Sequence, residues 1–245
     1  MLRPCHGRTQ GWPAVTSEEL LGSDGDDHRR IDADQWEDIY VVGDVHGCLP
    51  ALERLVERID PDDETLLVTV GDLVRKGPDS RGVVEFVRER DNVISVRGNN
   101  EAKLIRGDKR LPGLTEANLA YVESLPHAIS WEGNLVVHGG VDPRKALADH
   151  EAAELLTMRS LAPGGSYDRP FWFEEYDGRP RVFFGHTVLA EPFESPSAVG
   201  LDTGCVYGGA LTAYHVDTGE FVTVEPTETH QERSADSIVT PRASG

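Results

Sequence analysis

The sequence predicts one α/β domain in which short buried strands alternate with amphipathic helices. Five apolar runs rich in β-branched side chains each stop at a small polar cluster, and helical patterns follow the first three runs. The runs are short enough for buried strands. They cover residues 39–42, 66–70, 93–96, 135–137 and 181–184. Strands that alternate with helices in this way are typical of a layered α/β fold.

Four helices are expected in the first half of the chain. They cover residues 51–59, 81–90, 101–107 and 115–125, and they begin beside Pro50, Ser80, Asn100 and Thr115. These four residue types all favour the start of a helix. In the first helix, the residues that make one apolar stripe are Leu52, Leu55, Val56 and Ile59.

After residue 126 the pattern changes to strands. Residues 127–140 have the pattern of a hairpin, and so do residues 210–225, where Asp217-Thr218-Gly219 is a turn signal. The chain is therefore α/β first and β-rich later, which predicts two sheets within one core, residues 38–226. The polar residues 1–37 and 227–245 are expected to be a flexible extension and a flexible tail.

The charge balance excludes several kinds of partner. The 245 residues include 43 acidic and 24 basic ones, which gives a formal charge of −19. A basic face, which binding to nucleic acid or to an anionic membrane requires, is therefore not expected. No apolar run reaches the roughly 20 residues of a transmembrane helix, and no signal-peptide pattern is present. The three cysteines form no disulfide or zinc pattern, so a reducing cytoplasm is expected.

Lysine is scarce, with four residues against 20 arginines. An acidic surface that is poor in lysine suits a protein that stays hydrated in high salt, so a halophilic source is expected. The alternative is an acidic protein from an ordinary cytoplasm, kept soluble by its net charge.

Polar side chains follow each predicted strand at its carboxyl end, where parallel α/β sheets form their ligand crevice. The side chains offer nitrogen and oxygen but no thiol, which suits manganese, iron or zinc. Their number exceeds what one ion needs and fits two divalent ions that share a carboxylate. The candidate metal ligands are Asp44, His46, Asp72, Asn99, His138 and His186.

Each of these residues also has a simpler explanation when taken alone. A Gly-Asp pair after a strand is common in turns that cap a helix, and a single histidine in an apolar segment is usually a hydrogen-bonded core residue. Five strand-to-polar junctions in one chain favour the metal site over these alternatives.

The ordered set of motifs resembles the calcineurin-like metallophosphoesterases, and within them the phosphoprotein phosphatase family with its prokaryotic members and the symmetrical diadenosine tetraphosphate hydrolases. The resemblance covers residues 39–214 and includes a block at 201–205. The motifs that carry it are Gly43-Asp44-Val45-His46-Gly47, residues 71–78 (GDLVRKGP), Arg97-Gly98-Asn99-Asn100-Glu101, His138-Gly139-Gly140 and Gly185-His186-Thr187.

The resemblance implies a single-domain β-sandwich of two mixed sheets flanked by helices, with metals at the strand ends. It implies that Asp44 and His46 bind a first ion, that Asp72 bridges both ions, and that Asn99, His138 and His186 complete the second site. It also implies hydrolysis by a metal-bound hydroxide without a covalent enzyme intermediate. The implied substrate is a phosphoprotein or a nucleotide polyphosphate.

Two departures from the family pattern bear on the chemistry. Arg75 and Lys76 replace an Asp that orients the catalytic histidine and an Arg that binds phosphate, and Asn100 replaces that histidine. Asparagine cannot transfer a proton, and losing a general acid costs ~10²–10⁴-fold in rate, mostly for poor leaving groups. We therefore treat Asn100, Lys76 and Arg75 as catalytic candidates. The candidate phosphate ligands are Lys76, Asn99 and Arg159.

Three functions remain open from the sequence. The first is a two-metal phosphohydrolase that acts on phosphoproteins or on phosphoanhydrides, and Asn100 favours the anhydrides. The second is a metal- and phosphate-binding module with weakened catalysis, and the third is a structural domain. Cys48 and Cys205 are expected to be packed residues. Core or surface packing is also favoured over a base-binding pocket for Trp131, Trp172 and Tyr176.

Overall fold

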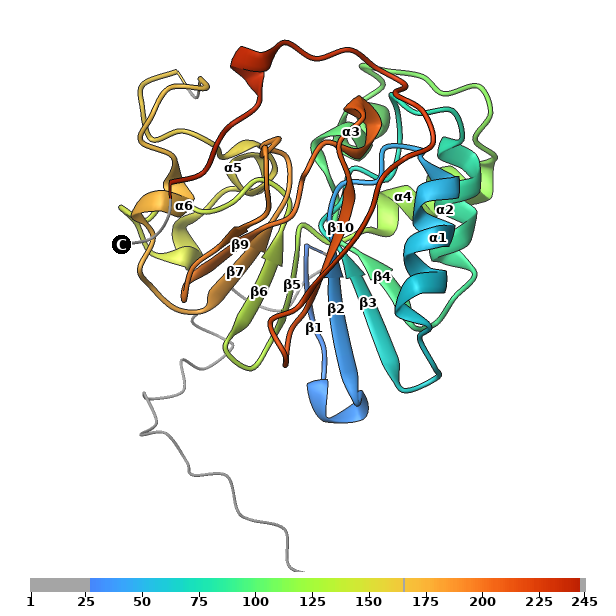
Figure 1. Cartoon of the computed structure of the whole chain (residues 1–245), viewed down its shortest axis with the longest axis horizontal. Coiled ribbons are helices and arrows are strands. Elements are labelled where there is room, and N and C mark those ends of the chain that lie inside the picture. The colour runs from blue at the N-terminus through green and yellow to red at the C-terminus, as the bar shows by residue number, and fades with distance from the viewer. Residues whose placement is uncertain (1–26, 165, 243–245) are drawn as a thin grey trace, which may run out of the picture.

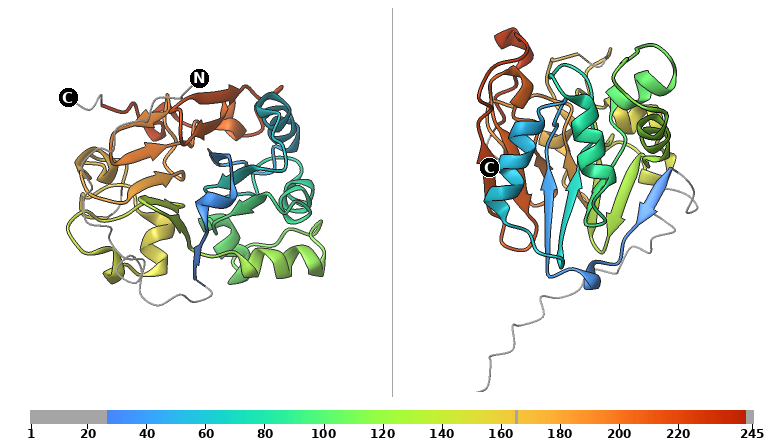
Figure 2. Two further views of the ribbon diagram at one scale, coloured as in Figure 1. Left: turned by 90° about the horizontal axis from the view of Figure 1, so that it is seen from below. Right: turned by 90° about the vertical axis from the view of Figure 1, so that its right-hand side faces the viewer.

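The computed structural model describes residues 27–164 and 166–242, which form two facing mixed sheets (Figures 1 and 2). The five-stranded sheet has the order β11-β10-β2-β3-β4. In it β2, β3 and β4 are parallel, and β10 is antiparallel to both β2 and β11. The strands are β2 (Asp38–Val42), β3 (Thr65–Thr69), β4 (Val93–Ser95), β10 (Leu211–His215) and β11 (Phe221–Val224).

The second sheet is six-stranded and has the order β1-β5-β6-β7-β9-β8. Its inner strands β6, β7 and β9 are parallel, and the β5–β6 pair is an antiparallel hairpin. The strands are β1 (His28–Arg30), β5 (Ala128–Trp131), β6 (Asn134–Val137), β7 (Arg181–Phe184), β8 (Phe193–Glu194) and β9 (Ala198–Gly200).

Helices cover the outer faces of both sheets (Figure 2). The helices α1, α2 and α4 pack on the five-stranded sheet, and α5 and α6 lie against the six-stranded one. The α-helices are α1 (Leu49–Ile59), α2 (Ser80–Arg88), α3 (Asn99–Ile105), α4 (Glu116–Ser124), α5 (Ala152–Thr157) and α6 (Trp172–Glu175). Short 3-10 turns are η2 (Ala33–Gln35), η3 (Leu147–Asp149), η4 (Cys205–Tyr207) and η5 (Ala235–Ser237).

Side-chain alternation along the strands builds the core in layers. Val41 of β2 and Val68 of β3 point into the space between the sheets, whereas Val42 and Leu67 point toward the helices. Both faces of these strands are buried, which explains why they appear in the sequence as continuous apolar runs. The predicted sandwich of two mixed sheets flanked by helices is confirmed.

Most predicted elements are present within a few residues of their expected bounds. The four helices correspond to α1–α4, and the two hairpins are β5–β6 and β10–β11. Thr115 caps α4 as expected, because its hydroxyl accepts from the N–H of Asn118 while the Asn118 amide oxygen accepts from the N–H of Thr115.

The structure differs from the expectation at both ends of the core. Residues 28–30, which we expected in the extension, form β1 and pair in parallel with β5. Val239, which we expected in the tail, is buried against the six-stranded sheet and pairs with Leu189. Three polar residues at a sheet edge carry no apolar pattern, so β1 had no signal in the sequence. Residues 1–26 and 243–245 lie outside the described residues.

The large aromatic residues and the cysteines have packing roles. Trp131 lies between the sheets, and Trp172 is fully buried, with its indole N–H donating to the carbonyl of Gly139 at 3.1 Å. Cys48 and Cys205 are both buried in the cluster beneath α1, and both are free thiols. Within the described residues, no helix has both the length and the hydropathy needed to span a membrane.

We expect Leu55→Ala to lower the free energy of unfolding by about 2–5 kcal/mol, because it leaves a cavity between α1 and the sheet. Leu55 is fully buried, whereas Leu119 on α4 is 39% exposed. The matched control Leu119→Ala should change the free energy of unfolding by less than about 1 kcal/mol. Urea denaturation measures both, and equal losses would contradict the described packing.

Candidate metal centre

The predicted ligands gather where the central strands of both sheets end. Asp44 follows β2, Asp72 follows β3, Asn99 opens α3 after β4, and His138 and His186 follow β6 and β7. Because these strands run in parallel within each sheet, their carboxyl ends share one edge. In Figure 1 this edge is the end of the molecule at which α3 lies.

Asp72 lies at the centre of the cluster. Its Oδ2 is 3.5 Å from Nε2 of His46, and its Oδ1 is 3.4 Å from Nε2 of His138. Nε2 of His46 is also 3.7 Å from Oδ2 of Asp44. Asp44, His46 and Asp72 each offer a ligand atom, and these three atoms lie within 4.8 Å of one another. The two oxygens of one carboxylate thus face two different imidazoles, which suits a carboxylate shared by two metal ions.

Backbone carbonyl groups orient both histidines. Nδ1 of His138 is 2.8 Å from the carbonyl oxygen of Val70, and Nδ1 of His46 is 3.3 Å from that of Val74. A proton on Nδ1 leaves the lone pair of Nε2 directed at Asp72, which is the tautomer that binds metals. Nε2 of His138 is buried and has no hydrogen-bond partner among the described residues. A buried nitrogen of this kind fits a metal ligand.

Asn99, His186 and Asp44 complete the cluster. Nδ2 of Asn99 lies 3.0 Å from Nδ1 of His186. The backbone N–H of His186 donates to both carboxylate oxygens of Asp44, at 3.2 and 3.3 Å. The rings of His138 and His186 are in edge contact, with their centroids 5.1 Å apart. The structure therefore brings all six sequence-predicted ligands together.

The loops that carry these ligands have strained backbones. Five of the six non-glycine residues with a positive φ in the described chain belong to this cluster or its flank. Left-handed conformations are unfavourable for residues with a Cβ, and they persist only where the surrounding structure enforces them. The five residues are His46, Asp72, Arg75, Lys76 and His186.

Close packing also requires glycine beside the ligands. A Cβ at Gly185 would overlap Oδ1 of Asp44, and a Cβ at Gly98 would overlap the backbone N and Oδ1 of Asp72. These two glycines therefore let the chain approach both carboxylates, which explains their presence in the strand-end motifs.

Burial sets the protonation of the cluster. It lowers the pKa of His46 to about 3 and the pKa of His186 well below its usual value, so both are neutral ligands at pH 7. Burial raises the pKa of Asp72, but the neighbouring histidines and Lys76 together lower it by more. The net pKa is therefore below its usual value, and the carboxylate stays ionised. Burial and two nearby carboxylates raise the pKa of Asp44. A divalent cation would relieve the repulsion between these carboxylates.

Arg75 and Asn100, which replace the family's Asp and His, contact each other. A guanidinium N–H of Arg75 donates to Oδ1 of Asn100. Nδ2 of Asn100 donates to Oδ2 of Asp72 and, at 2.8 Å, to Oδ1 of Asn99. The Asn100 side chain therefore uses its polar atoms to hold two metal-ligand candidates in place.

Lys76 and Arg159 lie at the two sides of the cluster. Nζ of Lys76 is 2.7 Å from Nε2 of His46, and Nη2 of Arg159 is 2.8 Å from Nε2 of His186. The predicted phosphate ligands are thus close to the predicted metal ligands. Lys76 bonds the nitrogen of His46 that faces Asp72, so metal binding there requires the Lys76 ammonium to turn away. Arg159 bonds Nε2 of His186, whereas Nδ1 of that ring faces Asn99.

Glu101 supports the cluster from beneath. Its side chain is completely buried and accepts hydrogen bonds from the backbone N–H groups of Asp72, Val74 and Gly98, at 2.8–3.0 Å. Burial and the charge of Asp72 raise the pKa of Glu101 to about 8, whereas the N–H donors favour its charged form. Glu101 therefore ties the start of α3 to the loop after β3.

Sequence reasoning gave no site role to four residues beside the cluster, although one of them, Asp202, lies in the block 201–205. Asp202 is buried and is close enough to Asp44 and Asp72 to influence their charge. It follows β9 at its carboxyl end, so the pattern of a strand followed by a polar residue could have identified it. The other three have no local signal, because segments distant in sequence bring them in: Tyr167, Tyr207 and Arg233.

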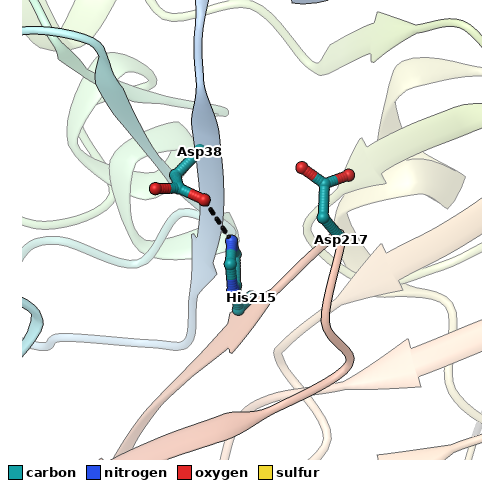
Figure 3. Close-up of side chains that lie close together, drawn as sticks. All are labelled: Asp38, His215 and Asp217. Carbon is teal, nitrogen blue, oxygen red and sulfur yellow. Dashed lines mark hydrogen bonds and ion pairs between the residues drawn. The ribbon is translucent and has the colours of Figure 1, made fainter. Parts of the chain in front are cut away.

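A second group that could hold a metal lies at the opposite end of β2 (Figure 3). Nε2 of His215 is 2.7 Å from Oδ1 of Asp38, and Nδ1 is 2.8 Å from Oγ1 of Thr218. Both imidazole nitrogens are therefore engaged, and Figure 3 draws no interaction between Asp217 and this pair. We interpret this group as a hydrogen-bonded cluster at the turn of the β10–β11 hairpin.

We expect Glu101→Gln to lower the free energy of unfolding by roughly 1–3 kcal/mol, because the glutamine NH₂ group would face backbone N–H donors and leave them unsatisfied. The matched control is Glu57→Gln on the exposed face of α1, which should be neutral. Urea denaturation of both variants checks this expectation. An unchanged midpoint for Glu101→Gln would show that Glu101 does not hold the loops.

Comparisons with known proteins agree with the geometry. Residues 38–207 match the calcineurin-like phosphoesterase family. The chain is 30% identical to serine/threonine-protein phosphatase 1 of Salmonella typhimurium, over 76% of this chain and 94% of that protein. It is 27% identical to a symmetrical bis(5'-nucleosyl)-tetraphosphatase of Pseudomonas entomophila, over 74% and 92% of the two chains.

A solved structure named as a diadenosine tetraphosphatase is also similar. It has a TM-score of 0.74 and 31% sequence identity, and the match covers 81% of this chain and 97% of that one. The relatives are named phosphatases and tetraphosphatases, which are hydrolases, and the family uses divalent metals. The resemblance stated from the motifs is therefore confirmed, and the chain belongs to the calcineurin-like phosphoesterase family.

Proposed function

We propose that this chain is a two-metal phosphohydrolase that prefers phosphoanhydrides and other substrates with good leaving groups. The observation that carries the proposal is the position of Asp72, whose carboxylate oxygens face Nε2 of His46 and Nε2 of His138. When bound, the ions supply an activated water and neutralise the charge of the phosphoryl group. The first ion would be held by Asp44, His46 and Asp72, and the second by Asp72, Asn99, His138 and His186.

Lys76 and Arg159 are proposed to bind the substrate phosphate. Each hydrogen-bonds one histidine of the cluster, so a phosphate placed over the cluster lies within reach of both cations. Lys76 acts as a point charge, without the two-pronged contact that an arginine makes. The amide of Asn99, which contacts both His186 and Asn100, is the third candidate phosphate ligand.

The contacts of Asn100 support the preference for good leaving groups. Its amide is engaged with Arg75, Asp72 and Asn99, and an amide does not transfer a proton at pH 7. A serine alkoxide leaves poorly without a proton, whereas a phosphate or nucleotide leaving group needs little protonation. Arg75 acts as a positioning residue, because it reaches the cluster through Asn100.

Three further features belong to this proposal. Manganese is the expected metal, since the donors are carboxylate, amide and imidazole groups. The scarcity of lysine and the charge of −19 support a cytoplasm of high salt content as the setting. The buried, reduced cysteine pair is compatible with a reducing compartment.

We expect manganese-dependent hydrolysis of para-nitrophenyl phosphate, whose leaving group needs little protonation. Asp72→Asn should reduce turnover by at least ~100-fold, because the shared carboxylate loses one charge. The matched control is Asp217→Asn, in the hairpin group of Figure 3, and it should keep full activity. Assays at low salt and in molar KCl also test the high-salt setting.

The wild type could instead bind metal and phosphate without turnover. In that case no condition gives hydrolysis, although the protein is folded and metal binding is measurable by calorimetry. That outcome would contradict the proposed enzyme. Turnover that survives Asp72→Asn would contradict the proposed site.

We expect the double variant Arg75→Asp/Asn100→His to gain activity on a phosphoserine peptide, because it restores an imidazole and a carboxylate that can orient it. General acid catalysis contributes ~10²–10⁴-fold, which bounds the gain. Para-nitrophenyl phosphate should change far less, so the ratio of the two rates is the readout. Equal changes for both substrates would show that leaving-group protonation is not what Asn100 limits.

A further inference from the structure

The C-terminal segment of residues 229–239 crosses the edge of the molecule that carries the metal-ligand candidates. One end is fixed at η4, where the N–H groups of His230 and Gln231 donate to the carbonyl of Val206 at 3.1 and 3.0 Å. The other end is fixed beyond β7, where Val239 exchanges hydrogen bonds with Val188 and Ala190. Figure 1 shows this segment in red over the end of the molecule at which α3 lies. We call residues 229–239 the strap.

The strap is also attached to the site itself. The side-chain amide of Gln231 donates to the backbone carbonyl of Lys76 at 3.3 Å. The strap therefore contacts the loop that carries a candidate phosphate ligand, and it lies outside the segment that matches the family.

Arg233 of the strap packs between two tyrosines. Its guanidinium carbon is 4.7 Å from the ring centre of Tyr207 and 5.6 Å from that of Tyr167. One of its N–H groups donates to the hydroxyl of Tyr167, and Nε donates to the carbonyl of Ser237 at 2.9 Å. These contacts fix the position of the side chain and leave Nη1 without an acceptor in the described part of the chain.

The same tyrosines pack against the two cations of the metal cluster. Arg159 lies 4.2 Å from the ring centre of Tyr167, and Nζ of Lys76 lies 5.2 Å from that of Tyr207. Arg233 thus contacts the same two rings as these cations, and in the described part of the chain it hydrogen-bonds none of the six candidate metal ligands. We call Lys76, Arg159 and Arg233 the cationic rim.

The cationic rim lacks partners of opposite charge. Within the described residues none of its three members forms an ion pair with a carboxylate, although acidic residues outnumber basic ones by 43 to 24. Burial raises the pKa of Asp202, while Lys76 and Arg233 lower it. Grouping three like charges costs energy unless an anion with several charges binds there.

We propose that Arg233 is a specificity-determining residue that binds the second or third phosphate of a linear polyphosphate chain. The proposal rests on the proposed function, because it assigns this role at the same site. A phosphate at the metal cluster reaches Lys76 and Arg159, which hydrogen-bond cluster histidines, whereas Arg233 meets the site only through the tyrosines that pack on those two cations. A substrate with a single phosphate does not reach it, so the rim selects for phosphate chains over phosphoproteins.

The test compares binding of inorganic tripolyphosphate and orthophosphate by calorimetry, with the full chain loaded with manganese. Arg233→Gln should weaken tripolyphosphate binding by roughly tenfold, since it removes one charge-assisted hydrogen bond. Orthophosphate binding should change by less than about twofold. The matched control is Arg242→Gln, which removes the same charge from an exposed position just beyond the strap and should change neither affinity.

Each other outcome overturns the proposal. Equal weakening of both ligands would make Arg233 a structural or general electrostatic residue, and no weakening would place it outside the binding site. Urea midpoints of the variants identify a loss that comes from unfolding of the strap. Failure of the proposed function is distinguishable from failure of this proposal. If the proposed function fails, the wild type does not hydrolyse para-nitrophenyl phosphate, although tripolyphosphate binding still depends on Arg233.

Discussion

The carboxylate of Asp72 is the constraint on which the rest of the site depends. It lies where β3 ends, accepts the N–H of Asn100 at the start of α3, and faces imidazoles that follow strands of both sheets. A helix N-terminus favours a negative charge at this point. One ionised side chain thus connects the two halves of the sandwich. Its position depends in turn on the left-handed backbone of Asp72 and on the missing Cβ of Gly98.

This arrangement buries several acidic groups close together, and burial with mutual repulsion raises the pKa of Asp44, Glu101 and Asp202. Asp44, Asp72, Glu101 and Asp202 are all buried at one edge. The compensating groups are the backbone donors around Glu101, the cations at the rim of the site, and the divalent ions that the family uses. Strain and repulsion of this kind lower stability, and they are typical of sites arranged for chemistry rather than for folding.

The sequence predicted which side chains gather at this edge, because their positions follow from topology. A polar residue directly after a buried parallel strand must lie at the carboxyl edge of its sheet, so Asp44, Asp72 and His138 could be placed without coordinates. The same rule would have found Asp202 after β9. Arg233 could not be found this way, because its place depends on how the strap packs across two sheets. Strand β1 was not predicted for a related reason. Its three polar residues form a strand only because they pair with β5, and that pairing is not visible in the local sequence.

The central claim is that Asp72 is shared by two metal ions. Anomalous diffraction from crystals grown with manganese tests it most directly. The account predicts two manganese peaks roughly 3.5–4 Å apart, one on each side of the Asp72 carboxylate. One peak alone at Asp72, or manganese bound only at the group formed by Asp38, His215 and Asp217, would contradict it.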